Sequence, residues 1–547
     1  MFKQLPLYLL STWLVAAVGC AGPRAQLFPN MGAHERTVIT ASAQARQYFT
    51  QGLTWSYAFN HDEAIRSFKR AAVLDPQCAM AWWGVALCEG PNYNDPVMTD
   101  ERSAAAWHAL QKALALIDNT TPVERALIEA LSHRYAKPWP KDRTTLEQAY
   151  ADAMASVWAD YPEDADVGTL YAEAMMVQSP WKLYSLDFKP AADTPMIEAT
   201  LERVMKLDPD HPGANHLYIH TVELSNSPDR GIPAADRLCD LVPGSGHLNH
   251  MPSHIYVKTG RWSRAIVQNE KAMRADAKYR ILSPQQGVQN LYMVHNAHML
   301  AYAAMMSGRE REALAAARAM WSTTPRDALT DPKVAPLVDP WYCAVYDVQK
   351  RFGRWDDIIT EPAPPSNLPI TTVVWRAHRA IAYAAKKDFA AADREQEAFS
   401  KAKAAIPADL LWFTDPAQEI LAVSERFVAG EIALHKGDLK LAADELEKGA
   451  DLEDALTYSE PPQWTLPVRH TLGAVYLKSG RYKDAERVYR EDLVKWPNNG
   501  WSLYGLSRAL QAQGRTPEAS EVQRRFRLAW KDADAPTTTS CKCIPKT

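Results

Sequence analysis

A set of seven histidines between residues 216 and 298 recurs at spacings that could hold a metal ion. His216 and His220 lie four residues apart, and His250 and His254 repeat this pair 34 residues later. A third copy begins at His298. Residues three and four apart share a face of a helix, so each group projects from one side. Imidazole ligands suit zinc, copper, nickel or iron, and they argue against calcium or magnesium.

The offset between the copies indicates the elements that position these side chains. Thirty-four residues is the length of one tetratricopeptide (TPR) repeat, which is a pair of helices joined by a turn. His247 and His295 each stand three residues before the first histidine of their copies, and Tyr302 takes the place of the second histidine in the third copy. Stacked repeats place equivalent faces side by side, so we expect the histidines to form one surface.

The rest of the chain supports this fold. Gly52, Phe68 and Pro76 fall on the small, aromatic and proline places of the TPR pattern, and Gly473 and Tyr489 do so late in the chain. Alternating strand segments and a βαβ rhythm are absent from the sequence. We therefore predict an all-α, TPR-type superhelix, or α-solenoid.

The GRW and GRE turns set the register without reference to the histidines. Gly260 and Gly308 then occupy the fifteenth place of their repeats. The resemblance to TPR proteins implies that the second, fifth, ninth and twelfth places point into the concave groove. These places hold His247 and His295 (second), His216, His250 and His298 (fifth), His220 and His254 (ninth) and Glu223 (twelfth).

The sharp hypothesis is a transition-metal site in this groove, with zinc, copper or iron as the ion. Neighbouring helices pack about 10 Å apart, so imidazoles from two of them could share one ion. The first quartet to consider is His216, His220, His250 and His254, and the alternatives or a neighbouring site are His247, His295 and His298.

Catalysis would need a group that moves protons, and Glu223 is the nearby acid in groove register. The sequence HTVE around it does not match HEXXH, so a zincin mechanism is not supported. Other readings stay open: the histidines could form a structural polar network, or a metal-free groove for a peptide or anion. Turn and packing roles are preferred for the remaining polar and aromatic side chains near the groove, which are Asn92, Asn94, Trp181, Tyr218 and Tyr256.

Composition excludes several function classes. The 547 residues carry a net charge of −4 and no long basic run, which argues against a nucleic-acid partner. No CxxCH occurs, so covalent haem is not indicated, and no nucleotide site is expected. The pair Cys541 and Cys543 lacks the spacing of a zinc hairpin, which favours a local disulfide or two free thiols.

The N-terminus predicts export. Lys3 precedes an apolar stretch at 5–18 that is short for a membrane span and ends in small residues before Cys20. The sequence AVGC at 17–20 resembles a bacterial lipobox, which implies cleavage before Cys20 and lipid attachment to its thiol; processing as an ordinary secreted protein is the alternative. The expected location is the cell envelope, as an outer-membrane lipoprotein facing the periplasm, with the lipid anchor as the contact with the membrane.

The predicted organisation has six parts. They are a lipoprotein-type signal peptide (1–19), a flexible mature N-terminus (20–40), an N-terminal TPR-like section with the histidine-rich groove (41–325), proline-rich joints around one helix pair (326–370), a C-terminal TPR section (371–531) and a disordered tail (532–547).

Four motifs carry a more specific resemblance: WWGVALCEGPNYN, NHLYIHTVE, GHLNHMPSHIYVKTGRW and HNAHMLAYAAMMSGR. They resemble a group of bacterial exported TPR proteins with histidine-rich repeats, over most of the chain to about Gly353; Met299 stands where that group has phenylalanine. The resemblance implies fold and site without a reaction.

The leading hypothesis is an envelope binding or scaffold protein with a protein or peptide partner and a groove metal site. The alternatives are a metal-dependent hydrolase or oxidoreductase, metal storage or delivery, and a metal-free peptide-binding protein. An enzyme should show an open coordination position beside an enclosed pocket, and a scaffold a long accessible groove.

Overall fold

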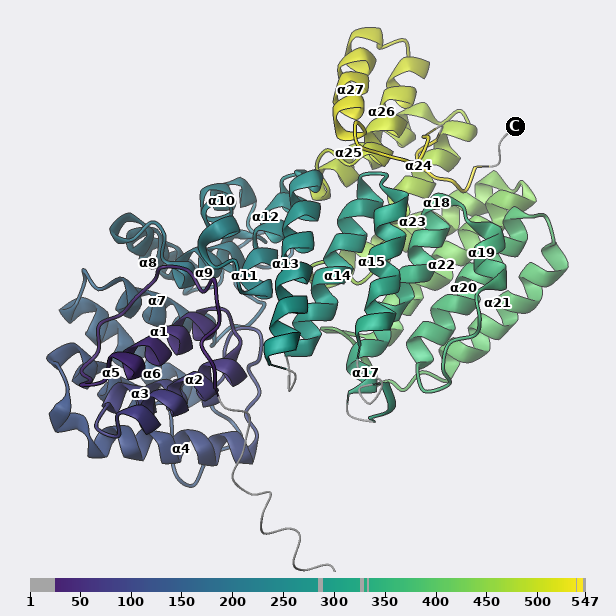
Figure 1. Ribbon diagram of the computed structural model, residues 1–547. Coiled ribbons are helices and arrows are strands. Elements are labelled where there is room, and N and C mark those ends of the chain that lie inside the picture. The colour runs from purple at the N-terminus through teal and green to yellow at the C-terminus, as the bar shows by residue number, and fades with distance from the viewer. Residues whose placement is uncertain (1–24, 284–288, 325–328, 332–333, 538, 545–547) are drawn as a thin grey trace, which may run out of the picture.

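In the computed structural model of the chain, successive antiparallel helix pairs form an elongated superhelix with almost no sheet (Figure 1). The structure describes residues 25–283, 289–324, 329–331, 334–537 and 539–544. The predicted signal peptide 1–19 and the predicted lipidation at Cys20 lie outside the described residues. Within the described ranges, none of the helices combines the length and the apolar character that a bilayer crossing requires.

Close contact between paired helices explains the small and aromatic places of the repeat. The Phe68 ring lies between Gly52 and Gly84, where an added Cβ would stand 2.7 Å from it on either side. The same arrangement recurs late in the chain with Gly473, Tyr489 and Gly505. These contacts confirm the TPR-type packing predicted from the sequence, because a larger residue at the glycine would push the helices apart.

The helices of the N-terminal section run from residue 43 to residue 323. They are α1 (Ala43–Tyr57), α2 (His61–Leu74), α3 (Ala79–Glu89), α4 (Asp100–Ala115), η1 (Ile117–Asn119), α5 (Pro122–Ser132), α6 (Thr144–Asp160), α7 (Ala165–Met176), α8 (Thr194–Leu207), α9 (Pro212–Val222), η2 (Pro228–Gly231), α10 (Ile232–Leu241), α11 (Gly246–His250), α12 (Pro252–Lys258), α13 (Trp262–Leu282), α14 (Gln289–Met306) and α15 (Glu310–Thr323).

The remaining helices continue the same stack. They are α17 (Ala335–Val338), η3 (Asp339–Cys343), α18 (Ala344–Phe352), α19 (Trp355–Thr360), α20 (Pro369–Ala385), α21 (Phe389–Ala404), α22 (Ala417–Lys436), α23 (Leu439–Ala455), α24 (Val468–Lys478), α25 (Tyr482–Lys495), α26 (Gly500–Ala512) and α27 (Thr516–Ala529). A two-residue antiparallel hairpin, β1 (Leu411–Trp412) with β2 (Asp415–Pro416), interrupts the otherwise helical pattern.

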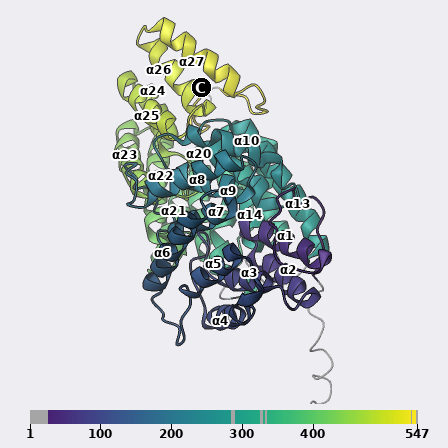
Figure 2. The same ribbon diagram turned by 90° about the vertical axis from the view of Figure 1, so that its left-hand side faces the viewer.

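The C-terminal repeats return to the middle of the superhelix (Figures 1 and 2). Trp262 Nε1 at the start of α13 donates to the Pro497 carbonyl at 3.0 Å. Trp501 Nε1 on α26 donates to the Met305 carbonyl at the end of α14, also at 3.0 Å. These bonds join segments about two hundred residues apart in sequence, so the two predicted TPR sections form one closed body.

Both segments expected to be flexible or disordered pack against the repeats where they are described. In the N-terminal segment, Arg36 is buried and its guanidinium pairs with Asp164 and Asp166 at 2.8 and 2.9 Å. In the tail, Ser540 is buried and donates to the His470 carbonyl at 3.1 Å. Sequence polarity suggested disorder, but these polar groups find partners between the helices, which fixes the chain in place. Cys541 and Cys543 form a disulfide.

Candidate metal centre

Three neighbouring helical segments carry the seven predicted histidines. α9 carries the first pair, α11 and α12 carry the middle three, and α14 carries His295 and His298. α11 and α12 follow each other directly and are separated at Pro252, which lacks the N–H that would continue the helix. All seven imidazoles are buried except that of His295, which is half-buried.

The first cluster, which we call triad 1, is His216, His220 and His247. Their ligand atoms lie within 4.8 Å of one another. His216 Nδ1 is 2.7 Å from the Tyr57 carbonyl, which only accepts, so this nitrogen carries the proton and Nε2 has the lone pair. His216 Nε2 lies 3.2 Å from His247 Nε2. His220 Nε2 has no hydrogen-bond partner among the described residues.

The second cluster, triad 2, is His250, His254 and His295, again with ligand atoms within 4.8 Å of one another. His250 Nδ1 lies 2.7 Å from Asn269 Oδ1, and Asn269 Nδ2 donates to the Ala265 carbonyl, which fixes the amide orientation. The His250 proton is therefore on Nδ1. The Nε2 atoms of His250 and His254 face each other at 2.8 Å.

Glu223, the residue that follows α9, joins the two triads. Its Oε1 lies 3.0 Å from His220 Nδ1, and its Oε2 lies 2.5 Å from His254 Nδ1. Burial alone would raise the pKa of Glu223, but His254 and His220 bring it well below its ordinary value. Glu223 is therefore a carboxylate that orients one imidazole in each triad and holds the proton of each on Nδ1.

Two facing lone pairs require a cation between them. In triad 2, Nδ1–H of His250 donates to Asn269 and Nδ1–H of His254 donates to Glu223, so the two Nε2 atoms, 2.8 Å apart, both present lone pairs when both imidazoles are neutral. A shared proton would satisfy these two atoms, whereas a metal ion would satisfy them together with His295. Nitrogen ligands 2.0–2.1 Å from one tetrahedral ion are about 3.3 Å apart, so metal binding would widen this 2.8 Å contact slightly.

The electrostatic surroundings keep most of these imidazoles neutral, as ligands must be. Burial, reinforced by the neighbouring histidines, lowers the pKa values of His216, His247, His250 and His295 well below 6.5. The exception is His254: burial lowers its pKa, but Glu223 more than offsets this, and the net direction is upward.

A cavity of about 370 Å³ opens beside the triads. One wall is made by histidines of both clusters, among them His220 and His254. The opposite wall comes from the C-terminal half of the chain and includes Trp341, Phe413 and Tyr458. The C-terminal half thus covers part of the predicted open groove and leaves a partly open pocket against the candidate metal ligands.

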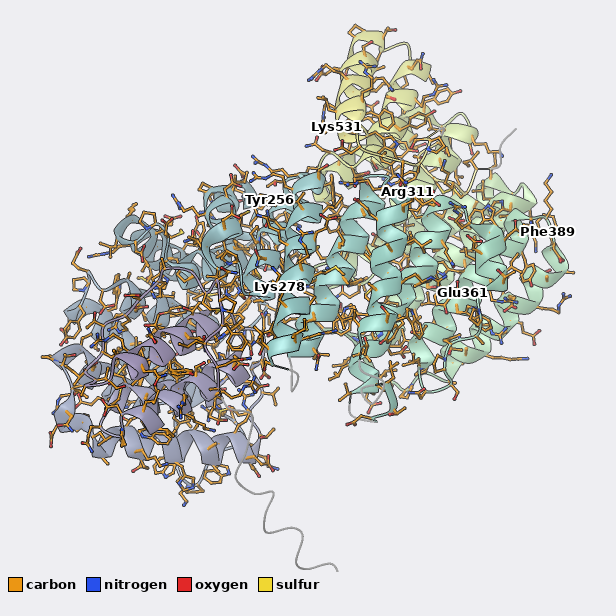
Figure 3. All side chains as sticks on the ribbon, viewed as in Figure 1. Tyr256, Lys278, Arg311, Glu361, Phe389 and Lys531 are labelled. Atoms are coloured by element: carbon orange, nitrogen blue, oxygen red, sulfur yellow. A yellow bond between two sulfur atoms is a disulfide. The ribbon has the colours of Figure 1, made fainter. Side chains whose placement is uncertain are left out.

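The structure places the other predicted residues as follows. The predicted first quartet divides between the triads, which His247 and His295 complete, while His298 lines the cavity outside both triads and leaves Nδ1 without a partner among the described residues. Tyr302 is buried in α14. Tyr218 donates to Glu202, and Tyr256, labelled in Figure 3, donates to Asp236; both contacts are in keeping with packing roles.

Of the three remaining residues, one has the turn role expected of it and two line the cavity. Asn92 Oδ1 accepts the backbone N–H groups of Asn94 and Asp95, as expected of turn chemistry. Asn94 and Trp181, for which turn roles were preferred, both line the cavity.

Sequence reasoning did not find the residues that orient and enclose the site. Asn269 lies on α13, the second helix of its repeat, and Tyr57 contributes a backbone carbonyl, which no side-chain pattern reports. Tyr458 and Glu460 lie more than two hundred residues from Glu223. The only sequence signal for the last two was their position in a proline-containing connection, since long connections in helical arrays often cover a site.

A third group, His34, Asp166 and His211, also brings three potential ligands together, but its hydrogen bonds are complete. His211 Nδ1 accepts from the Ala214 N–H at 3.1 Å, so its proton is on Nε2, which donates to Asp166 at 3.2 Å. His34 and Tyr57 also bond to this carboxylate. The group fastens the N-terminal segment to α7 and α9.

Comparisons with known proteins agree with the repeat architecture. Residues 470–500 match the tetratricopeptide repeat family. No curated protein matches the chain. Solved structures similar to it include a human IFIT1 dimer with m7Gppp-AAAA, at 14% identity and a TM-score of 0.30 over 90% of this chain and 92% of that one. Another is the APC/C hetero-tetramer Cut9-Hcn1, at 13% identity and a TM-score of 0.29 over 88% of this chain and 76% of that one. Scores this low carry no argument about the site.

Proposed function

We propose that the chain is a metal-dependent enzyme that holds two transition-metal ions, one at each histidine triad, and acts on a small molecule in the adjoining cavity. The observation that carries this proposal is the pair of facing Nε2 atoms of His250 and His254, 2.8 Å apart, with both Nδ1 atoms held by acceptors. A third imidazole, His295, has a ligand atom within 4.8 Å of those of His250 and His254, which supports a metal ion over a shared proton.

The arrangement around the triads has the features of a metal site. Histidine ligands usually donate their second ring nitrogen to a carboxylate, an amide or a backbone carbonyl, and Glu223, Asn269 and the Tyr57 carbonyl serve in these roles. Three protein ligands for each ion leave coordination positions for substrate or water. Zinc at the site would suit hydrolysis, and copper or iron would suit oxidation.

The size of the cavity favours an enzyme over a scaffold. The sequence suggested a binding protein with a long accessible groove, but the candidate ligands instead border a pocket of about 370 Å³ that the C-terminal half partly covers. This volume suits a small molecule and is too small for a folded segment of a partner. A protein or peptide partner stays a second candidate function, supported by the TPR match at residues 470–500, and would bind outside this pocket.

The test is metal analysis of the purified mature protein with single substitutions. We expect about two equivalents of a first-row transition metal in the unaltered chain. His216→Ala should lose the ion of triad 1 and His250→Ala that of triad 2, while His108→Ala, at an exposed position on α4, should lose neither. X-ray absorption on the loaded protein should show nitrogen ligands. A folded protein that contains no metal and takes up no zinc, copper or iron refutes the proposal.

We further propose export and lipidation at Cys20, on the basis of the AVGC sequence at 17–20. The Cys541–Cys543 disulfide suits an oxidising compartment outside the cytoplasm. Mass spectrometry of the mature N-terminus tests this directly: a lipid-modified Cys20 supports it, and an unprocessed Met1 contradicts it.

A further inference from the structure

The cavity beside the triads has two chemically different walls. Besides the histidines, aromatic rings line it from both halves of the chain: Trp181 and Tyr292 from the N-terminal half, and Trp341 and Phe413 from the C-terminal half. Trp341 and Phe413 lie with ring centroids 5.5 Å apart, and His298 faces Phe413 at 6.0 Å. Such walls favour a flat apolar ligand, because rings pack face to edge or offset with little loss of side-chain freedom.

One acidic side chain interrupts the apolar wall. Glu460 is buried, with 5% of its surface exposed, and lines the cavity. Its Oε1 is 2.7 Å from the Tyr458 hydroxyl, and the same hydroxyl is 3.0 Å from Glu223 Oε2. Glu460 Oε2 has no hydrogen-bond partner among the residues that the structure describes. A buried polar atom without a partner is costly, so a ligand group that pairs with it gains affinity.

Proton counting shows which kind of ligand group Glu460 Oε2 can pair with. The Tyr458 hydroxyl has one proton and two carboxyl neighbours, so one of those carboxyls must donate to it. Glu223 already accepts from two imidazoles and its pKa is lowered, whereas burial raises the pKa of Glu460 to about 7. Glu460 is therefore the carboxyl better suited to donate from Oε1, and in either protonation state its Oε2 is an acceptor without a partner among the described residues, on a side chain that lines the cavity.

We propose that the cavity binds a small aromatic molecule whose hydroxyl or amino group donates a hydrogen bond to Glu460 Oε2 while its ring packs between Trp341 and the histidine wall. This inference rests on the proposed function, since it names the substrate class of the same site. A single ring with short substituents fits the volume of about 370 Å³. The ring then lies between the triads and Glu460, and Glu460 acts as a specificity-determining residue.

The experiment compares two probes on the metal-loaded full chain by calorimetry. 4-Methylphenol carries the donor, and 4-methylanisole has the same ring with the donor methylated. We expect 4-methylphenol to bind about 10-fold more tightly than 4-methylanisole, because 4-methylanisole leaves Glu460 Oε2 without a hydrogen bond. Glu460→Leu should abolish this preference. Glu460→Gln should keep it, since the amide can donate to Tyr458 and offer its oxygen to the cavity. Glu419→Leu, at an exposed position on α22, is the matched control and should leave the preference unchanged.

The outcomes separate this inference from the proposed function. Metal content is measured on the same samples, so a protein that holds metal but binds neither probe refutes the inference and leaves the metal proposal standing. Equal affinity for the two probes, or an unchanged preference in folded Glu460→Leu, refutes it as well. A metal-free protein that still prefers 4-methylphenol in a Glu460-dependent way supports the ligand site and overturns the metal proposal. If Glu460→Leu does not fold, the wild-type preference and Glu460→Gln decide the matter.

Discussion

Substitution of Glu223 tests whether one carboxylate orients both triads. In Glu223→Gln one carboxylate oxygen becomes an NH₂ group, so only one histidine keeps its acceptor. Oε2 accepts from both His254 and Tyr458, whereas Oε1 accepts from His220 alone. The amide oxygen is therefore expected at the Oε2 position and the NH₂ group beside His220 Nδ1.

The consequence is an asymmetric loss of metal affinity. The NH₂ group can only donate, so the proton of His220 moves to Nε2 and removes the lone pair that triad 1 needs. His254 keeps its acceptor, so triad 2 is retained. Loss of an orienting partner lowers metal affinity by about 10- to 100-fold, or about 1.4 to 2.7 kcal/mol. We expect a decrease of this size at triad 1 in Glu223→Gln, and at both triads in Glu223→Ala.

A competition titration against a chromophoric chelator, fitted to two sites, measures both affinities. The reciprocal variant is Asn269→Leu, which removes the acceptor of His250 Nδ1 and should weaken triad 2 alone. Circular dichroism establishes that each variant is folded. Unchanged affinity at both sites in Glu223→Gln, or an equal loss at both, would refute the assignment of Oε1 and Oε2 to separate triads.

Three further predictions concern stability. Burial raises the pKa of Asp276 from 3.8 to about 7, so the folded state keeps a proton that the unfolded state releases. The free energy of unfolding should therefore fall by about 1.4 kcal/mol per pH unit as the pH rises from 5 to 7. Asp276→Asn should lose this pH dependence in urea titrations with chelator present. Gly246→Ala should lower the free energy of unfolding by about 1–3 kcal/mol, because the new Cβ would stand 1.9 Å from Asp276 Oδ1. Gly449→Ala, whose Cβ would have its nearest atom at 3.3 Å, is the control, and equal effects of the two substitutions in urea titrations would contradict this reasoning. Adding the native metal at 100 times its dissociation constant should stabilise the chelated protein by about 2.7 kcal/mol for each occupied triad, and no shift in the unfolding midpoint would count against a site in the folded state.

Sequence spacing was sufficient to predict the fold and the gathering of the histidines. The 34-residue offset between the pairs places His216 and His250 at equivalent points of stacked repeats, and stacking brings equivalent points together. It did not predict how the seven divide. His247 lies three residues before His250 and faces the α9 side, next to His216, whereas His250 faces His295 on α14. A helix that lies between two others contacts both, and the sequence spacing alone does not show which neighbour each of its residues contacts.

The ring protons and the second wall of the site depend on long-range geometry. The protonated nitrogen of His250 is fixed by Asn269 on the second helix of the repeat, and that of His216 by the Tyr57 carbonyl of α1. The contact between Tyr458 and Glu223 spans 235 residues, and it exists because many small rotations between repeats add up to a closed superhelix. Small errors in each rotation accumulate, so a repeat pattern does not predict whether the two ends of a solenoid meet.

The position of the C-terminal half also bears on the proposed choice between an enzyme and a scaffold. A TPR scaffold binds its partner along a concave face that is open to solvent, but here the equivalent face is occupied by the chain itself. His216 and His250 are completely buried, and Trp341, Phe413 and Tyr458 stand across from the triads. An extended peptide would have to displace these residues and break the Tyr458–Glu223 bond. A small molecule needs none of this, because the cavity is lined by aromatic rings and bordered by Glu460 and His220, whose Oε2 and Nε2 atoms have no hydrogen-bond partner among the described residues. The segments that narrow the groove therefore support the proposal of an enzyme, with a pocket in which a substrate would face oriented ligands.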